Sequence, residues 1–196
     1  MRKTGFAVVI SSPSGAGKTT VVNKLLGENN DLIRVVTATT RKPRKNEKDK
    51  RDYHFWSESK FKKAIDAKLL VERAKVYGNY YGVPKTEVDK GIKHGKIPVL
   101  VIDVQGAKTV KKLYPTSVLV FLMPPSFKEL KKRLTCRKDN SKDTAKRLKI
   151  AKSEISKITM YDYVVVNDKI KNALRFLKAI IIAERLKTKR QKVKFS

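Results

Sequence analysis

The sequence predicts an α/β fold in which a parallel sheet is covered by helices. Short apolar runs alternate with segments of helical spacing along the 196 residues, as they do in doubly wound folds. The runs "IPVLVIDV" and "SVLVFLM" are apolar almost throughout, which is typical of central strands buried on both faces. A glycine-containing loop, "SSPSGAGKTT", joins the first apolar run to the first helical segment. Together these observations indicate a phosphate-loop core.

The apolar runs fix where strands are expected. Each is short and rich in β-branched residues, and helices fill much of the space between them. The last helix is expected from about Ile170 to Leu186, and the tail beyond it, "KTKRQKVKFS", is expected to be disordered. The expected strands are residues 6–11, 33–37, 97–103, 117–122 and 162–166.

Two segments interrupt this alternation. Residues 38–90 carry the strand-like pieces "YHFW" and "LLVERAKVY" around a helix at "SESKFKKAIDAK", and residues 126–158 are almost wholly helical and very basic. A phosphate-loop core with two insertions is the plan of a nucleoside monophosphate kinase, where one insertion holds the acceptor and the other closes as a lid. We therefore expect one domain over residues 1–196, with its core in 1–37, 91–125 and 159–196.

The glycine-containing loop has the context that a phosphate site requires, because a strand precedes it and a helix follows. Its main-chain N–H groups and the helix dipole would cradle phosphates, while Lys18 adds positive charge and Thr19 offers a hydroxyl to Mg²⁺. The loop departs from G-x-x-x-x-G-K-[ST] at Ser12, which replaces the first glycine. Serine can replace glycine here only if the φ angle of Ser12 lies in a region that L-residues readily adopt. The expected ATP-binding residues of the loop are Ser14, Gly15, Ala16, Gly17, Lys18, Thr19 and Thr20.

The formal net charge of +29 raises the question of nucleic acid as a partner. The basic residues are scattered over nearly every segment, and no zinc ligands, RNP-like strand or heptad-linked basic helix accompany them. A lysine-biased surface is therefore preferred to a specific nucleic-acid partner, which stays as an alternative. No apolar stretch approaches 18 residues, so no membrane span is expected. The single cysteine, Cys136, agrees with a reducing cytoplasm.

A second candidate phosphate site follows the second expected strand, in "TATTRKPRKNEKDKRDYHFW". Arg41 and Arg44 supply two guanidinium forks and Tyr53 a phenol, which suit a dianionic phosphate. Alone, such a basic loop is usually solvated surface. The stretch "VERAKVYGNYYGVPK" then places a lone carboxylate, Glu72, among lysines.

At this point the chain clearly resembles the guanylate kinase family, nearly from end to end. The resemblance implies transfer of the γ-phosphoryl group of MgATP to GMP, and also to dGMP, giving ADP and GDP in purine nucleotide metabolism. The family's motifs occur here in order, as "PSGAGKTT", "TATTRKPR", "DYHFW", "GNYYG", "IDVQGA", "PPS", "RL…R", "AKRL" and "YDYVVVND".

The resemblance also assigns roles to individual residues. Glu72 is implied to accept the N1–H and N2 amine of guanine, a pair of donors that adenine lacks. In the lid, Arg137 and Arg147, assisted by Arg133, are implied to reach over the ATP phosphates, and Asn167 lies on the adenine side. The implied GMP-binding residues are Thr37, Arg41, Arg44, Tyr53, Glu72, Tyr81 and Asp103. The implied catalytic residues are Lys18, Arg41, Arg137 and Arg147, with Thr19 on Mg²⁺.

Two further departures from the family pattern fall on the acceptor side. Val83 stands where the family often has Ser or Thr, and Val101 where it usually has a second aspartate. Both replacements remove polar groups from the acceptor side. We therefore expect them to affect the affinity for GMP more than the type of reaction. A non-catalytic guanylate-kinase-like module that binds phosphopeptides is the other alternative. We expect a monomer or a small homo-oligomer.

Overall fold

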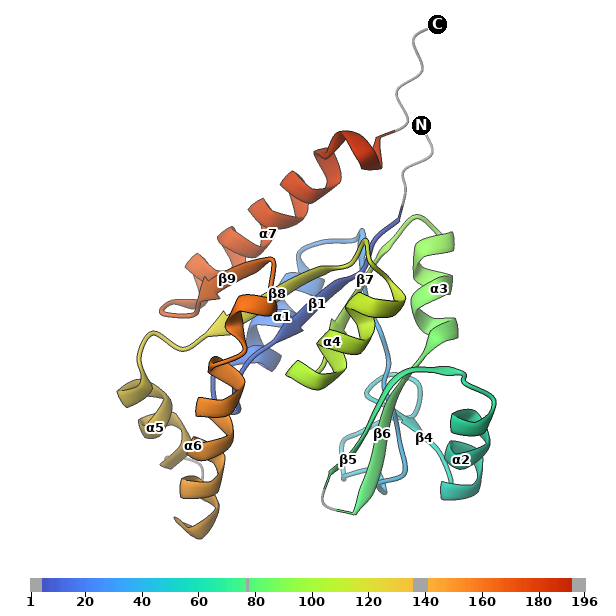
Figure 1. Cartoon of the computed structure of the whole chain (residues 1–196), viewed down its shortest axis with the longest axis horizontal. Coiled ribbons are helices and arrows are strands. Elements are labelled where there is room, and N and C mark those ends of the chain that lie inside the picture. Colours follow the sequence, from blue (N-terminus) through green and yellow to red (C-terminus); the bar gives the residue numbers. More distant parts are fainter. Residues whose placement is uncertain (1–4, 77, 136–140, 192–196) are drawn as a thin grey trace, which may run out of the picture.

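The computed structural model describes residues 5–76, 78–135 and 141–191. Within these ranges a five-stranded parallel sheet, in the order β2-β7-β1-β8-β9, forms the centre of the molecule (Figure 1). Each strand overlaps one of the expected runs, and the predicted α/β fold class is confirmed. The strands are β1 (Val8–Ser11), β2 (Leu32–Arg34), β7 (Ile97–Val101), β8 (Val118–Met123) and β9 (Tyr163–Val166).

Helices cover both faces of this sheet because its central strands bury alternate residues on opposite sides. Val8 and Ile10 of β1 pack in the cluster that includes α1 and α7, whereas Ala7 and Val9 pack in the cluster that includes α3 and α4. Full burial of one such side chain contributes about 1.5–3 kcal/mol. The covering helices are α1 (Lys18–Gly27), α3 (Lys85–Lys93), α4 (Val104–Leu113) and α7 (Ile170–Leu186).

A second, smaller sheet lies beside the core, in the order β4-β3-β6-β5. Its hairpin β5–β6 packs closely on α2: a Cβ at Gly82 would lie 2.9 Å from Phe61 Cζ and 2.9 Å from the carbonyl O of Glu72. The sequence indicated β4, α2 and β5 but not β6, whose alternation is broken by this glycine. The elements are β3 (Ala38–Thr39), β4 (His54–Phe55), α2 (Glu58–Asp66), β5 (Leu70–Val76) and β6 (Asn79–Pro84).

Two helices that follow β8 form a separate arm, α5 (Phe127–Thr135) and α6 (Ser141–Ile155). They pack on one another through Leu130, Leu134 and Ala151. In Figure 1 this arm and the small sheet flank one end of the core, while the start of β1 and the end of α7 lie toward the other end. The arrangement leaves the carboxyl edge of the sheet between the two insertions.

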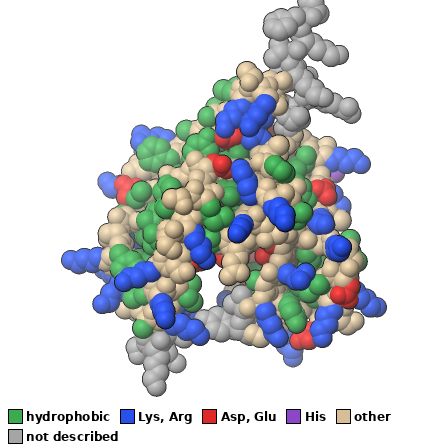
Figure 2. Space-filling model, in the orientation of Figure 1, with side chains coloured by type: hydrophobic (Ala, Val, Ile, Leu, Met, Phe, Trp, Pro, Cys, Tyr) green, Lys and Arg blue, Asp and Glu red, His purple; other side chains and the backbone are tan. Residues whose placement is uncertain are grey.

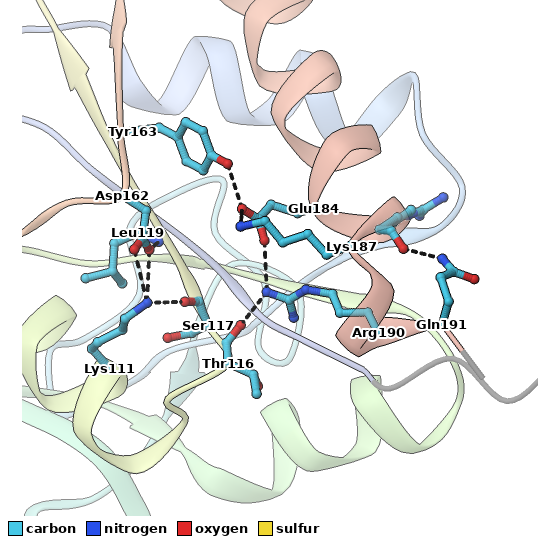
Figure 3. A network of polar contacts seen from close by, with 11 residues as sticks. Lys111, Thr116, Ser117, Leu119, Asp162, Tyr163, Glu184, Lys187, Arg190 and Gln191 are labelled. Carbon is cyan, nitrogen blue, oxygen red and sulfur yellow. Dashed lines mark hydrogen bonds and ion pairs between the residues drawn. The ribbon is translucent and has the colours of Figure 1, made fainter. Parts of the chain in front are cut away.

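The expectation that the tail is disordered was wrong for its first residues. Residues 188–190 form a short 3-10 turn, and Arg190 donates to Glu184 Oε2 (2.9 Å) and to the carbonyl O of Thr116 (2.9 Å) (Figure 3). Glu184 is 2% exposed and also accepts from the Tyr163 hydroxyl (2.6 Å). A carboxylate this buried requires a counter-charge, so the basic tail is held by α7. Residues 192–196 lie outside the described residues.

The visible surface shows Lys and Arg side chains spread over the core, the arm and the small sheet, without one dominant patch (Figure 2). In the described part of the chain, no helix combines the length and apolar character that crossing a bilayer requires. The distribution of charge agrees with a general lysine bias of the surface.

Candidate active site

The candidate site lies at the carboxyl edge of the core sheet, where ligands bind in open α/β folds. β1 leads into the phosphate loop, β7 is followed by Asp103, and β9 is followed by Asn167. Because parallel strands end at the same edge, residues far apart in the sequence meet there. The hydroxyl of Ser11, for example, donates to the carbonyl O of Asp103 (3.4 Å).

The phosphate loop turns at its two remaining glycines. Gly15 and Gly17 have φ values of 89° and 87°, in the left-handed region that favours glycine. Ser12 is not among the non-glycine residues of the described chain with positive φ, so a serine is accommodated there without strain. Its side chain is buried and donates to the carbonyl O of Pro13 (3.2 Å). The replaced glycine therefore leaves the loop's fold intact.

Neighbouring side chains hold this loop in place. Asn167 is buried, and its Nδ2 donates to the carbonyl O of Ala16 (2.7 Å). A Cβ at Gly17 would lie 2.7 Å from the same Nδ2, and one at Gly15 would lie 3.0 Å from Leu134 Cδ2 of α5. The structure thus gives Asn167 a role as support of the loop, separate from the adenine-side role that the resemblance implies.

The loop encloses a cavity of about 350 Å³. Lys18 reaches under it, with Nζ 3.5 Å from the carbonyl O of Ile102. Burial lowers the pKa of Lys18, while the nearby Glu154 and Asp103 carboxylates act in the opposite direction. A desolvated ammonium beside main-chain donors attracts an anion strongly. The described residues that line the cavity are Ser12, Pro13, Ser14, Gly15, Gly17, Lys18, Thr19, Thr20 and Glu154.

Of the three predicted lid arginines, the two that the structure describes, Arg133 and Arg147, do not line this cavity. Arg133 donates to Glu129 Oε1 (2.9 Å), one turn earlier on α5. Arg147 lies half-buried on α6 and is absent from the cavity lining, and Arg137 lies outside the described residues. Contact between Arg133 or Arg147 and a nucleotide bound in this cavity would thus require the arm to move.

On the acceptor side, Arg41 is the centre of an aromatic cluster. Its Cζ lies 5.4 Å from the ring centroid of Tyr53 and 5.9 Å from that of Phe55. The rings of Tyr53 and Tyr81 meet edge to face at 6.2 Å. Three of the predicted phosphate ligands, Arg41, Tyr53 and Tyr81, are therefore brought together by β3, β4 and β6.

Glu72 of β5 is the acceptor-side carboxylate with the clearest perturbation. Its Oε2 would lie 3.2 Å from a Cβ at Gly106, so the absence of a side chain there leaves room for it against α4. Burial, and then the charge of nearby Asp103, raise the pKa of Glu72 to about 7. A hydrogen-bond partner for this carboxylate is not found among the described residues. A half-buried carboxylate with a raised pKa and without a hydrogen-bond partner among the described residues is typical of functional sites.

On the acceptor side, the described contacts of Asp103, Thr37 and Val83 are structural ones. Asp103 Oδ1 accepts from the Gly106 N–H (2.8 Å) and so caps α4. Thr37 precedes β3, and its carbonyl O accepts from His54 N (2.9 Å). Val83 is 1% exposed and packs inside the core cluster that includes Val71. The valine at 83 thus contributes to packing in this chain.

Sequence reasoning missed two acidic residues at the site, Glu47 and Glu154. Glu47 accepts from Arg41 Nη2 (2.9 Å) and from the Arg44 N–H (2.8 Å). The sequence feature that could have indicated Glu47 is its place three positions after Arg44 in a basic loop. Glu154 comes to the phosphate loop from α6, where burial raises its pKa. A contact between segments so far apart leaves no local signal.

The site fits Mg²⁺ that arrives with a nucleotide. Groups of three or more His, Cys, Asp or Glu that could hold a metal are not found in the described part of the chain. Mg²⁺ usually keeps several waters and is held by one or two protein oxygens together with substrate phosphates. Thr19 and Glu154 both line the cavity, and their side-chain oxygens are donors of that kind.

Comparison with known proteins gives one consistent family. The family model described as guanylate kinase matches residues 4–184. Guanylate kinase of Caldanaerobacter subterraneus subsp. tengcongensis is 42% identical over 193 residues, which are 98% of this chain and 94% of that protein. Guanylate kinase of Maricaulis maris is 46% identical over 188 residues, 95% of this chain and 86% of that protein.

The fold leads to the same family. The crystal structure of guanylate kinase from Anaplasma phagocytophilum superposes with a TM-score of 0.80 at 36% sequence identity, and the match covers 98% of this chain and 92% of that one.

Proposed function

The chain belongs to the guanylate kinase family, and from this premise we propose that it transfers the γ-phosphoryl group of ATP to GMP, and to dGMP, giving ADP and GDP. The phosphate loop would hold the donor and the small sheet the acceptor. Little covalent chemistry is asked of the protein, because positioning and neutralisation of charge supply most of the acceleration in phosphoryl transfer.

The assignment of GMP as the acceptor rests mainly on the carboxylate of Glu72. It is desolvated, lacks a partner among the described residues and faces the small residue Gly106. Guanine offers N1–H and the N2 amine side by side, and one carboxylate can accept from both. Adenine would leave that carboxylate buried and unpaired, a loss worth factors up to roughly 10⁴–10⁵. Thr37 would add a hydroxyl on the same base.

Arg41, Arg44, Tyr53 and Tyr81 would fix the GMP phosphate. The aromatic cluster holds the guanidinium of Arg41, and that arrangement supports its role. The phosphate oxygen of GMP is already anionic at neutral pH, so no general base is required for its attack. Positioning of this oxygen in line with the γ-phosphate is then the main task of the acceptor half.

Lys18 and the main-chain N–H groups of the loop would neutralise the charge that develops on the ATP phosphates. Bound Mg²⁺ would supply further neutralisation, with Thr19 as its protein ligand. Arg133, Arg137 and Arg147 would reach the phosphates when the arm closes, and Asn167 would contact the adenine while supporting the loop. Closure excludes water, which favours transfer to GMP over hydrolysis.

These roles fit a cytoplasmic enzyme of purine nucleotide metabolism that acts as a monomer or small homo-oligomer, without a specific nucleic-acid partner. The basic side chains are scattered over the face that Figure 2 shows, which supports the last point. Binding to duplex DNA with nanomolar affinity and a steep salt dependence would contradict it.

A coupled assay of ADP release tests the proposed reaction. With ATP as donor, we expect turnover with GMP and dGMP and at least a hundredfold lower kcat/KM with AMP, UMP and dTMP. Comparable rates with AMP, or ADP release that is independent of any acceptor, would contradict the proposal.

A further inference from the structure

We propose that Glu47 is a positioning residue for the GMP phosphate: it orients the guanidinium of Arg41 and holds the main chain at Arg44. This inference rests on the proposed function, in which both arginines bind that phosphate. One carboxylate connects the two, through Arg41 Nη2 (2.9 Å) and the Arg44 N–H (2.8 Å).

The surroundings of Glu47 suit this role. The side chains of Arg41 and Glu47 are 17% and 20% exposed, so their ion pair is largely shielded from solvent. Hydrogen bonds from Arg41 and from the Arg44 N–H lower the pKa of Glu47, so the pair stays charged at neutral pH. The Glu47 N–H also donates to the carbonyl O of Arg44 (3.0 Å), which closes the turn.

The contacts of Arg41 leave part of its guanidinium available for a ligand. An arginine has five N–H donors; Nη2 is directed to Glu47, and Nη1 to the carbonyl O of Lys42 (2.7 Å). These two contacts use two of the five donors, and the rings of Tyr53 and Phe55 lie near the guanidinium. With the side chain fixed in this way, less rotamer entropy is lost when phosphate binds.

Two other carboxylates of the same loop show what is special about Glu47. Asp49 accepts from Phe55 N (3.0 Å), and Asp52 accepts from Lys48 N (2.8 Å) and from Arg51 (2.7 Å). Each therefore secures the loop's main chain, as Glu47 does. Only Glu47, of these three, also binds a proposed phosphate ligand. Asp52→Asn is consequently a matched control, since it removes the same charge from a similar arginine contact.

The same contacts would also suit an opposite role for Glu47, in which its carboxylate occupies the phosphate site and must leave before GMP binds. The two roles predict opposite changes in GMP affinity when Glu47 is replaced. A positioning residue improves GMP affinity, so its loss weakens binding; a competing carboxylate reduces GMP affinity, so its loss tightens binding.

The test is the affinity of the full chain for GMP and for guanosine, measured by titration calorimetry on Glu47→Gln, Glu47→Asp and Asp52→Asn. For Glu47→Gln we expect the Kd for GMP to rise about tenfold or more, since a charge-assisted contact is lost, while the Kd for guanosine stays within about twofold because guanosine has no phosphate. Glu47→Asp should be intermediate for GMP, and Asp52→Asn should match wild type for both ligands. In the assay, Glu47→Gln should raise the KM for GMP and leave the KM for ATP unchanged.

Tighter GMP binding by Glu47→Gln, unchanged binding, or equal weakening for GMP and guanosine would each overturn the inference. If Glu47→Gln does not fold, Glu47→Asp decides by the same criterion, a loss confined to GMP. Arg41→Ala separates this result from the proposed function. If Arg41→Ala keeps wild-type GMP affinity, the phosphate site itself is misassigned. If Arg41→Ala weakens GMP and Glu47→Gln does not, only the role of Glu47 fails.

Discussion

The loop after β1 and the loop after β3 are both proposed to hold a phosphate, but they are built from different parts. The first loop uses main-chain N–H groups, two left-handed glycines and a single lysine, and it is braced by Asn167 and by Leu134 of the arm. The second uses side chains, with Arg41 held by Glu47 and stacked near Tyr53. A main-chain site depends on geometry, whereas a side-chain site depends on counter-charges that keep its arginines in place.

This difference predicts where substitutions act. A change in the first loop should affect transfer, because charge develops there as the phosphoryl group moves. A change in the second should affect mainly the affinity for the acceptor, because the GMP phosphate already carries its negative charge when it binds.

Lys18→Ala should lower kcat by about 10²–10³-fold, since Lys18 is the cation under the cavity of the phosphate loop. GMP binding, measured by calorimetry without ATP, should remain within about twofold of wild type. Retention of more than about a tenth of the wild-type kcat would show that this loop is not the donor site.

Arg147→Ala should lower kcat by about 10–10²-fold while the KM for GMP changes little, because Arg147 is proposed to reach the ATP phosphates only on closure of the arm. Arg137→Ala is expected to behave in the same way. Steady-state kinetics with each substrate varied in turn measures both. Weakened GMP affinity with an unchanged kcat would instead place these arginines in the acceptor half.

Affinity for guanosine should rise with pH, because only the ionised carboxylate of Glu72 can accept both guanine donors. Its pKa of about 7 means that the ionised fraction increases roughly tenfold between pH 6 and pH 8, and the Kd should fall by about that factor and then level. Guanosine is the appropriate ligand because the phosphate of GMP itself titrates near pH 6. Glu72→Gln should lose this dependence; a flat wild-type profile would mean that Glu72 does not contact the base.

Val83→Thr should change the KM for GMP by a few-fold at most. Val83 is 1% exposed within an apolar cluster, so the new hydroxyl should lower the free energy of unfolding by about 1–2 kcal/mol. Thermal unfolding and KM measured on the same preparation test both parts. A tenfold gain in GMP affinity would show that the hydroxyl reaches the base after all.

The features that could be predicted from the sequence also divide between main-chain patterns and side-chain contacts. The five core strands were predictable because "IPVLVIDV" and similar runs are apolar on both faces, and the phosphate loop because glycine, lysine and threonine have fixed spacing. The conformation of Ser12 could not be predicted, because the sequence does not determine its φ value. The contacts of Glu47, of Glu154 with the phosphate loop, and of Arg190 with Glu184 were also missed, because each is a pairing of charges set by tertiary packing.

Selection of guanine by the single carboxylate of Glu72 can be measured as kcat/KM for GMP and for AMP on the wild type and on Glu72→Gln. An amide cannot accept from both guanine donors, so the ratio of the two constants should fall by about 10²-fold or more. The activity that remains with each substrate should still depend on Lys18. If Glu72→Gln keeps the wild-type ratio, another group reads the base and the account of the acceptor half is wrong.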